Sequence, residues 1–177
     1  FDFVNSDQPA EIRVSNMYGG GTWAKVGKTS LELSNNQPTM NFSWLNQYTT
    51  ESEFSAVILH QFGHALGLID EQVHPQANLQ WNKPYIYEYY RRTAGWTKDV
   101  VDQTIFYNYP DYKIAYSNYD PYSVMHLPVP SQFTFNGFTL GWNTQLSATD
   151  RAFIQKLYPF QGKPDPSVCK NERTIYA

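Results

Sequence analysis

The sequence predicts an α+β protein, because short strand-like segments come first and helices follow. Alternating or apolar runs bounded by turn-forming residues fill residues 1–44. From residue 50 onward, apolar residues recur at helical spacing instead. Strands and helices segregated along the chain are typical of the α+β class.

Four strands are expected in the first part of the chain. They are residues 1–4, 11–15, 31–33 and 39–44. Turn-rich runs at residues 5–9 and 35–38 separate them, and three glycines at 19–21 form a further turn. In the last segment, Met40, Phe42 and Trp44 fall on one face of the strand.

The helices are predicted from their caps. Thr50 and Glu53 form a capping box that opens a helix reaching about Leu66. Further helices are expected at residues 85–92, with Asn82 as the cap and Gly95 as the end, at 97–106, and from Ser147 to about Tyr158. We therefore expect one domain over residues 1–160 and an extended tail over 161–177.

Composition narrows the function classes. A net charge of −3 and a pI near 5.8 argue against nucleic acid or an anionic membrane as a partner. No apolar run approaches the roughly 18–20 residues of a membrane span. The low charged fraction of 16% and the richness in Asn, Gln, Ser and Thr favour a secreted, extracellular protein.

The most informative stretch is His60 to Gln72, which reads HQFGHALGLIDEQ. His60 and His64 are four residues apart, so on a helix they lie on the same face. Two imidazoles at this spacing can hold one Zn²⁺, with each nitrogen about 2.0–2.1 Å from the metal. Gly67 is placed to end the helix in the left-handed conformation, and Asp70 could then supply a third ligand. His74 is the alternative third ligand, although Pro75 constrains it.

This stretch is similar to the H-E-x-x-H-x-x-G-x-x-H pattern of metzincin zinc proteases. The string Ser123-Val124-Met125-His126 resembles the Met-containing turn of the astacin group of that family. In the family this methionine, here Met125, lies beneath the metal as a hydrophobic floor. An Asp at the third ligand position resembles the snapalysin branch, whereas Leu127 replaces a Tyr that astacins carry.

The resemblance extends along most of the chain and implies a particular fold. A twisted sheet would lie above a zinc-binding helix, with an irregular lower subdomain that ends in a helix. The opening strand and helix of the family have no counterpart in this sequence, so a separate N-terminal segment or propeptide is a possible partner. Residues 39–44 would be the edge strand that binds a peptide or protein substrate by strand addition, with Thr39, Asn41 and Ser43 in contact with it.

Gln61 stands where the family has its general-base Glu. By this likeness the chain is a zinc metalloendopeptidase whose catalytic step is slowed by about 10²–10⁴-fold, the usual worth of general acid–base catalysis. Two explanations stay open at this point: an introduced inactivating substitution, or a naturally non-catalytic relative that binds peptides or proteins. A third alternative is a structural zinc domain, whose site would be closed by four protein ligands.

The single cysteine, Cys169, rules out an internal disulfide. Its thiolate could occupy an open zinc position from the tail, whereas the simpler interpretation is a free thiol.

Overall fold

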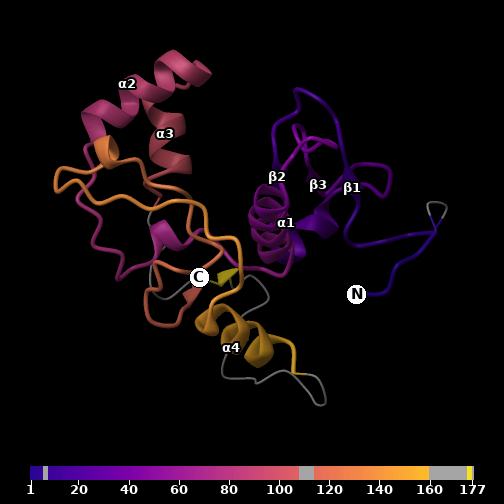
Figure 1. Ribbon diagram of the computed structural model, residues 1–177. Coiled ribbons are helices and arrows are strands. Elements are labelled where there is room, and N and C mark those ends of the chain that lie inside the picture. The colour runs from indigo at the N-terminus through magenta and orange to yellow at the C-terminus, as the bar shows by residue number, and fades with distance from the viewer. Residues whose placement is uncertain (6–7, 108–113, 160–174, 177) are drawn as a thin grey trace.

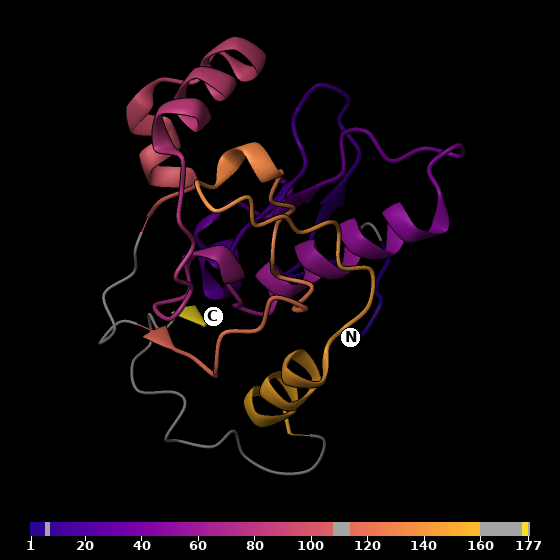
Figure 2. The ribbon, with the colours of Figure 1, turned by 60° about the vertical axis from the view of Figure 1, so that its left-hand side comes forward.

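The computed structural model describes residues 1–5, 8–107, 114–159 and 175–176. The longest helix, α1 (Glu51–Ala65), lies beside a small sheet, and the helices α2 (Lys83–Ala94) and α3 (Lys98–Thr104) form a separate group across the molecule (Figure 1). A last helix, α4 (Ala148–Leu157), lies at the opposite end from α2 and α3 (Figure 2). This mixed architecture confirms the predicted α+β class. Within the described residues, no helix is long and apolar enough to cross a membrane.

The sheet has three strands, β1 (Val14–Ser15), β2 (Trp23–Ala24) and β3 (Met40–Asn41), in the order β1-β3-β2. The strand β1 runs parallel to β3, and β2 runs antiparallel to it. The Asn41 side chain joins this sheet to the glycine-rich turn: its oxygen accepts from the backbone N–H of Met17 at 2.8 Å, and its amide donates to the carbonyl of Gly21 at 2.6 Å.

The prediction that residues 39–44 form the edge strand is wrong, because β3 is the central strand. The backbone of Thr39 is bonded on both sides: its N–H donates to Arg13 and its carbonyl accepts from Lys25. Thr39 and Asn41 are also buried, and the backbone N–H of Ser43 donates to the Thr22 hydroxyl. The backbone that a peptide would need for strand addition is therefore already used.

Three other local predictions also fail. Residues 1–4 form no strand; Phe3 is 97% exposed, and the Phe1 ring instead packs on Phe62 with centroids 5.4 Å apart. Residues 31–33 lie at the end of a 3₁₀ helix, Gly27–Glu32, because the N–H of Thr29 and of Leu33 bond locally rather than to a strand. Trp44 is 42% exposed and does not share the burial of Met40 and Phe42.

The helices follow the prediction closely. The capping box is present at α1: the Glu53 carboxylate accepts from the Thr50 N–H, and the Thr50 hydroxyl accepts from the Glu53 N–H. Asn82 caps α2, and Gly95 ends it at φ +67°. Thr97 caps α3, and Ser147 caps α4 with Asp150 as its capping-box partner.

Three apolar clusters hold these elements together. The apolar face of α1 packs against the sheet through Met40, Phe42 and Val57. A second cluster, built around Ile86, Val101 and Phe133, joins α2 and α3. The third packs α4 through Leu157, Phe153 and Ile154 against Met125 and Leu68. Residues 160–174 and 177, and with them Cys169, lie outside the described residues, whereas β5 (Ile175–Tyr176) pairs in parallel with β4 (Ile114–Ala115).

Asp150 fastens α4 to the turn that contains Met125. Its side chain is buried, and its carboxylate accepts from the Ser123 hydroxyl at 2.7 Å, the Val124 N–H at 3.0 Å and the Ser147 N–H at 2.8 Å. A carboxylate that accepts several hydrogen bonds in the interior fixes the groups that donate to it. Asp150 is therefore one of the groups that hold this turn in position.

We expect Asp150→Ala to lower the free energy of unfolding by about 3 kcal/mol, because it leaves buried donors without an acceptor. Urea unfolding followed by circular dichroism measures this loss. Asp99→Ala is the matched control, since Asp99 also lies in the first turn of a helix but is exposed; its loss should stay below about 1 kcal/mol. Equal losses in the two variants would contradict the role given to Asp150.

Candidate metal centre

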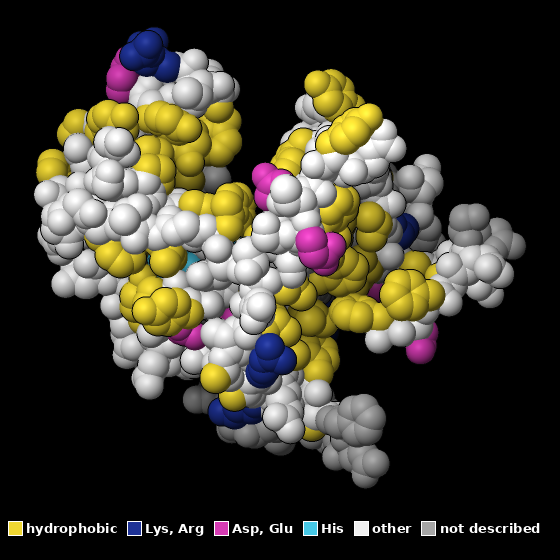
Figure 3. Space-filling model, in the orientation of Figure 1, with side chains coloured by type: hydrophobic (Ala, Val, Ile, Leu, Met, Phe, Trp, Pro, Cys, Tyr) yellow, Lys and Arg dark blue, Asp and Glu magenta, His cyan; other side chains and the backbone are white. Residues whose placement is uncertain are grey.

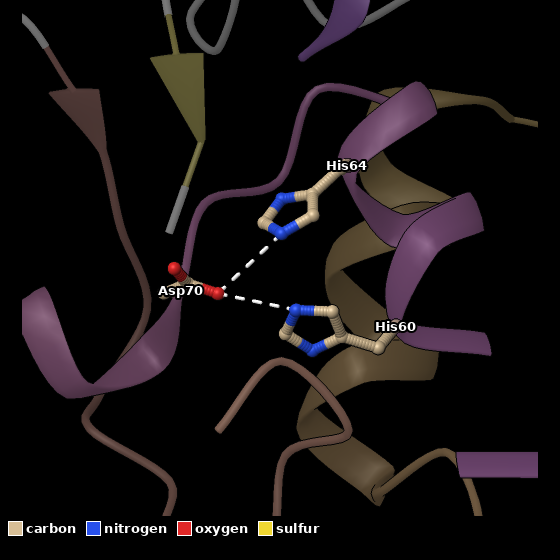
Figure 4. A group of neighbouring side chains, drawn as sticks. All are labelled: His60, His64 and Asp70. Carbon is tan, nitrogen blue, oxygen red and sulfur yellow. Dashed lines mark ion pairs between the residues drawn. The ribbon is translucent and has the colours of Figure 1, made fainter. Parts of the chain in front are cut away.

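The structure brings His60, His64 and Asp70 together at the end of α1 (Figure 4). Both histidines project from the same face of the helix, and Asp70 comes back toward them after a sharp turn. The Asp70 Oδ1 atom lies 3.2 Å from His60 Nε2 and 3.4 Å from His64 Nε2. One ligand atom from each residue can be chosen so that all lie within 4.8 Å of one another. The three residues predicted as ligands could therefore hold one metal ion.

The turn between the helix and Asp70 depends on glycine. Gly67 follows the C-cap residue Leu66 and has φ +99°, a conformation that costs other residues energy. The N–H of Leu68 then donates back to the carbonyl of Gly63 at 3.0 Å. A Cβ on Gly27 would lie only 3.1 Å from the Gly67 Cα, so the two segments touch backbone to backbone.

The histidine rings are oriented by backbone carbonyls. His60 Nδ1 lies 3.0 Å from the carbonyl of Val124, and His64 Nδ1 lies 2.9 Å from the carbonyl of Leu68. A carbonyl can only accept, so each Nδ1 carries the proton, and the neutral ring keeps its free electron pair on Nε2. Metal-binding histidines are typically held in this way. The Nε2 atoms of both histidines face the same Asp70 oxygen (Figure 4).

Asp70 is the residue with the most unusual electrostatics. Burial by itself raises its pKa, but the nearby rings of His60 and His64, which can carry a positive charge, hold the pKa of this carboxyl well below its usual range. Burial likewise lowers the pKa of His64, whereas its contacts with Asp70 and with the Leu68 carbonyl raise it overall. The Asp70 Oδ1 atom is buried without a hydrogen bond among the described residues. A buried carboxylate oxygen in this state is well suited to a cation.

Met125 packs against α1 at Gly63, which lies between His60 and His64 in the sequence. A Cβ on Gly63 would overlap the sulfur of Met125 and lie 3.2 Å from its terminal methyl carbon. Met125 is 2% exposed, and its N–H donates to the Ser123 hydroxyl. The predicted Met-containing turn is therefore packed directly on the helix that carries His60 and His64.

Gln61 is buried beside His60 on α1, and its side-chain oxygen has no hydrogen bond among the described residues. On a helix, positions 60, 61 and 64 share one side. His74, the alternative ligand, is not part of the cluster: its Nε2 lies 3.0 Å from the Ser117 carbonyl, and its Nδ1 accepts from the Gln76 N–H. Both of its ring nitrogens already have partners.

Two residues that follow Asp70 tie it to the turn at Met125, and sequence reasoning gave neither a role. The N–H of Glu71 donates to the Met125 carbonyl, and its carboxylate accepts from the Asp120 N–H at 2.7 Å. The Gln72 side-chain oxygen accepts from the Leu127 N–H at 3.1 Å. The only sequence signal for these contacts was the string Asp70-Glu71-Gln72, which matched the family without indicating what its members touch.

Next to Met125, His126 and Tyr119 form a further pair that the sequence did not reveal. His126 Nδ1 lies 2.8 Å from the Leu127 carbonyl, and its Nε2 lies 2.9 Å from the Tyr119 hydroxyl. Burial lowers the pKa of His126, and burial with the nearby charges of Glu71 and Asp120 raises the pKa of Tyr119 to about 12. The phenol therefore stays protonated and donates to the imidazole.

Two solved structures of myroilysin are similar to this chain. In one, the matched region covers 92% of this chain and 79% of that chain, with 41% sequence identity and a TM-score of 0.85. In the other it covers 90% of this chain and 69% of that chain, with 40% identity and a TM-score of 0.64. No protein-family model and no curated protein sequence matches the chain.

Burial raises the pKa of Glu71 to about 8, with smaller contributions from the charges of Asp120 and Asp150. In the unfolded chain this carboxyl returns to its ordinary pKa of 4.5. The folded chain therefore holds a proton that the unfolded chain releases as the pH rises above 4.5, so the stability that this proton confers is lost progressively up to about pH 8.

We expect Glu71→Gln, which cannot titrate, to reduce this loss of stability in protein kept metal-free with a chelator. The measurement is the free energy of unfolding in urea at about pH 5 and about pH 9, compared between the parent and the variant. Each unit of difference between the folded and unfolded pKa corresponds to about 1.4 kcal/mol of this free energy. Glu88→Gln on the exposed face of α2 is the control and should leave the pH profile unchanged. Identical profiles for the parent and Glu71→Gln would contradict the buried, protonated state of Glu71.

Proposed function

The chain belongs to the myroilysin family of metzincin-like proteases, and from this premise we propose that it is a zinc-dependent metalloendopeptidase in which Gln61 replaces the general base. The astacin group is the branch that its Met-containing turn favours. We propose a peptide or protein as the substrate, and the secreted location expected from composition belongs to the same proposal.

One observation supports this proposal most strongly: the Nε2 atoms of two oriented imidazoles converge on one oxygen of the Asp70 carboxylate. That oxygen, Oδ1, has no hydrogen bond among the described residues. Two histidines and one carboxylate are a ligand set of catalytic zinc sites, which keep a position open for water or substrate. His60, His64 and Asp70 would hold the ion. When bound, Zn²⁺ would polarise the scissile carbonyl and acidify a water molecule.

The residue at position 61 decides whether this site can catalyse the reaction. A glutamate there would take a proton from the attacking water and later deliver it to the leaving amine. The Gln61 amide is nearly the same size and can hydrogen-bond a water through its oxygen, but an amide has no basic group at neutral pH. Gln61 therefore preserves the shape of the site and removes its proton carrier.

The central position of β3 calls for a different edge of the sheet as the substrate-binding strand. Because β3 is central, the edges of the sheet are β1 and β2, and we propose that the substrate uses β2, which pairs antiparallel with β3. A peptide that adds to the sheet would pair with Trp23–Ala24. Figure 3 shows a hollow between the α2–α3 side of the molecule and the side of α1 and the sheet, with apolar side chains on both walls.

We expect Gln61→Glu to raise the rate of peptide hydrolysis by about 10²–10⁴-fold over the parent, because it restores a general base. Cleavage of a mixture of unlabelled peptides of varied sequence, followed by mass spectrometry, measures this rate whichever side chains the site prefers beside the scissile bond. A chelator should abolish the activity, and added Zn²⁺ should restore it.

The double variant Gln61→Glu with Asp70→Ala is the matched control, since it carries the base but lacks one ligand. It should be inactive at the zinc concentration that saturates the single variant. Absence of hydrolysis in Gln61→Glu, while it binds one zinc ion per chain, would contradict the peptidase assignment.

The second candidate function is a non-catalytic peptide-binding module on the same fold, which Gln61 itself favours. Here the metal site would be occupied and peptides would bind to both the parent and the Gln61→Glu variant without cleavage. Binding of a peptide mixture, measured by mass spectrometry of the retained and released fractions, distinguishes the two candidates.

Metal binding is tested separately from activity. We expect one Zn²⁺ per chain by elemental analysis, and Asp70→Ala should weaken the affinity by at least about tenfold, because it removes a direct ligand. His74→Ala is the control and should retain the full zinc content. Loss of zinc in His74→Ala but not in Asp70→Ala would overturn the assignment of the third ligand.

A further inference from the structure

A recess separate from the metal centre lies among the loops on the side of the molecule that carries α2 and α3, and we refer to these loops and helices as the subdomain. Its volume is about 250 Å³, smaller than the about 300–1,000 Å³ of pockets for drug-sized ligands. Four amide side chains and two aromatic rings supply most of its lining: Gln76, Asn78, Gln80, Asn136, Tyr119 and Phe138. None of its lining residues carries a charge.

The walls of this recess are preformed. On one side, the N–H groups of Leu79 and Trp81 each donate to the carbonyl two residues earlier. These two bonds form tight γ-turns that stiffen the segment. The N–H of Phe135 donates to the Gln80 carbonyl at 2.7 Å and joins this segment to the loop that forms the opposite side. On that loop, the Thr134 hydroxyl donates to the Phe138 carbonyl.

The orientation of the amides determines what the recess offers. The Gln76 oxygen accepts from the Tyr119 N–H, and the Asn136 oxygen accepts from the Phe138 N–H. The Asn78 oxygen accepts from the Gln80 side chain at 3.0 Å. The remaining polar atoms of these amides have no hydrogen-bond partner among the described residues. They are the NH₂ groups of Gln76, Asn78 and Asn136 and the side-chain oxygen of Gln80. The residues that line the recess therefore have three donor groups and one acceptor available for a ligand, beside two aromatic rings.

We propose that this recess binds one neutral sugar residue. A ligand that fits must offer several acceptor oxygens, carry no charge and present an apolar face to Tyr119 and Phe138. A sugar ring has hydroxyl oxygens around its edge and C–H groups on its face, so it meets all these conditions. A carboxylate or phosphate would call for Arg or Lys, which the lining lacks. An Asn or Gln side chain of a peptide would supply only one oxygen.

This inference goes beyond the proposed peptidase function and does not depend on it. It assigns the subdomain a role in holding a glycan, and Tyr119 connects the two sites, because its ring lines the recess while its hydroxyl bonds to His126 beside Met125. A sugar in the recess would thus lie on the same structural unit as the turn beneath the metal centre.

The experiment uses the full chain with Gln61 and four neutral probes: cellotriose, maltotriose, mannotriose and chitotriose. Saturation-transfer NMR detects binding, and calorimetry measures it. We expect at least one probe to bind with a Kd of about 0.1–10 mM, as suits a small site. Asn78→Ala combined with Gln80→Ala should weaken this binding by about tenfold or more, from the loss of two or more hydrogen bonds.

Both substituted residues are exposed, so the fold should persist, and an unchanged thermal unfolding temperature checks it. Gln132→Ala, an exposed amide on the neighbouring loop that does not line the recess, is the control and should bind the sugar normally. Absence of binding of all four probes up to about 10 mM would overturn the proposal. So would unchanged binding in the double variant, or binding of acetyl-glutamine-amide in place of the sugars, which would assign the recess to a polypeptide side chain.

Discussion

The arrangement of this protein depends on one buried carboxylate oxygen, Asp70 Oδ1, which faces the free nitrogens of His60 and His64. This oxygen faces two imidazole nitrogens and has no hydrogen bond among the described residues. Burying such a group is costly unless its charge is matched. A cation at this point would satisfy all three ligand atoms at once, and the surrounding structure is built to keep them in place.

That support comes from contacts that join segments far apart in the sequence. The carbonyl of Val124 fixes the His60 ring, and Glu71 and Gln72 bind the backbone of Met125 and Leu127. Asp150 then fixes the same turn to α4. The helix α1, Asp70 and the Met-containing turn are therefore one connected unit, in which backbone groups and buried side chains set the positions of His60, His64 and Asp70. Contacts that orient the ligating side chains, rather than touching the metal themselves, commonly tune the metal affinity of a site.

Local signals predicted the helices well and singled out the three residues that the structure brings together, His60, His64 and Asp70, because caps and helical spacing act over only a few residues. The capping boxes at Thr50 and Ser147 and the terminal Gly95 mark their helices within one turn. The strands were harder, because which strand is central depends on pairing partners that the sequence does not specify. The family resemblance implied an edge strand at residues 39–44, yet β1 and β2 enclose β3 from both sides. The contacts of Glu71 and Asp150 span 49 and 26 residues respectively, so no local pattern could predict them.

The central claim is that His60, His64 and Asp70 hold a zinc ion at an open site, and anomalous diffraction at the zinc absorption edge tests it most directly. The account predicts a single peak bonded to Nε2 of both histidines, each at about 2.0–2.1 Å, and to one oxygen of Asp70, with the fourth position taken by solvent or ligand. A protein grown with zinc that shows no peak there, or a peak closed by a fourth protein ligand, would contradict it.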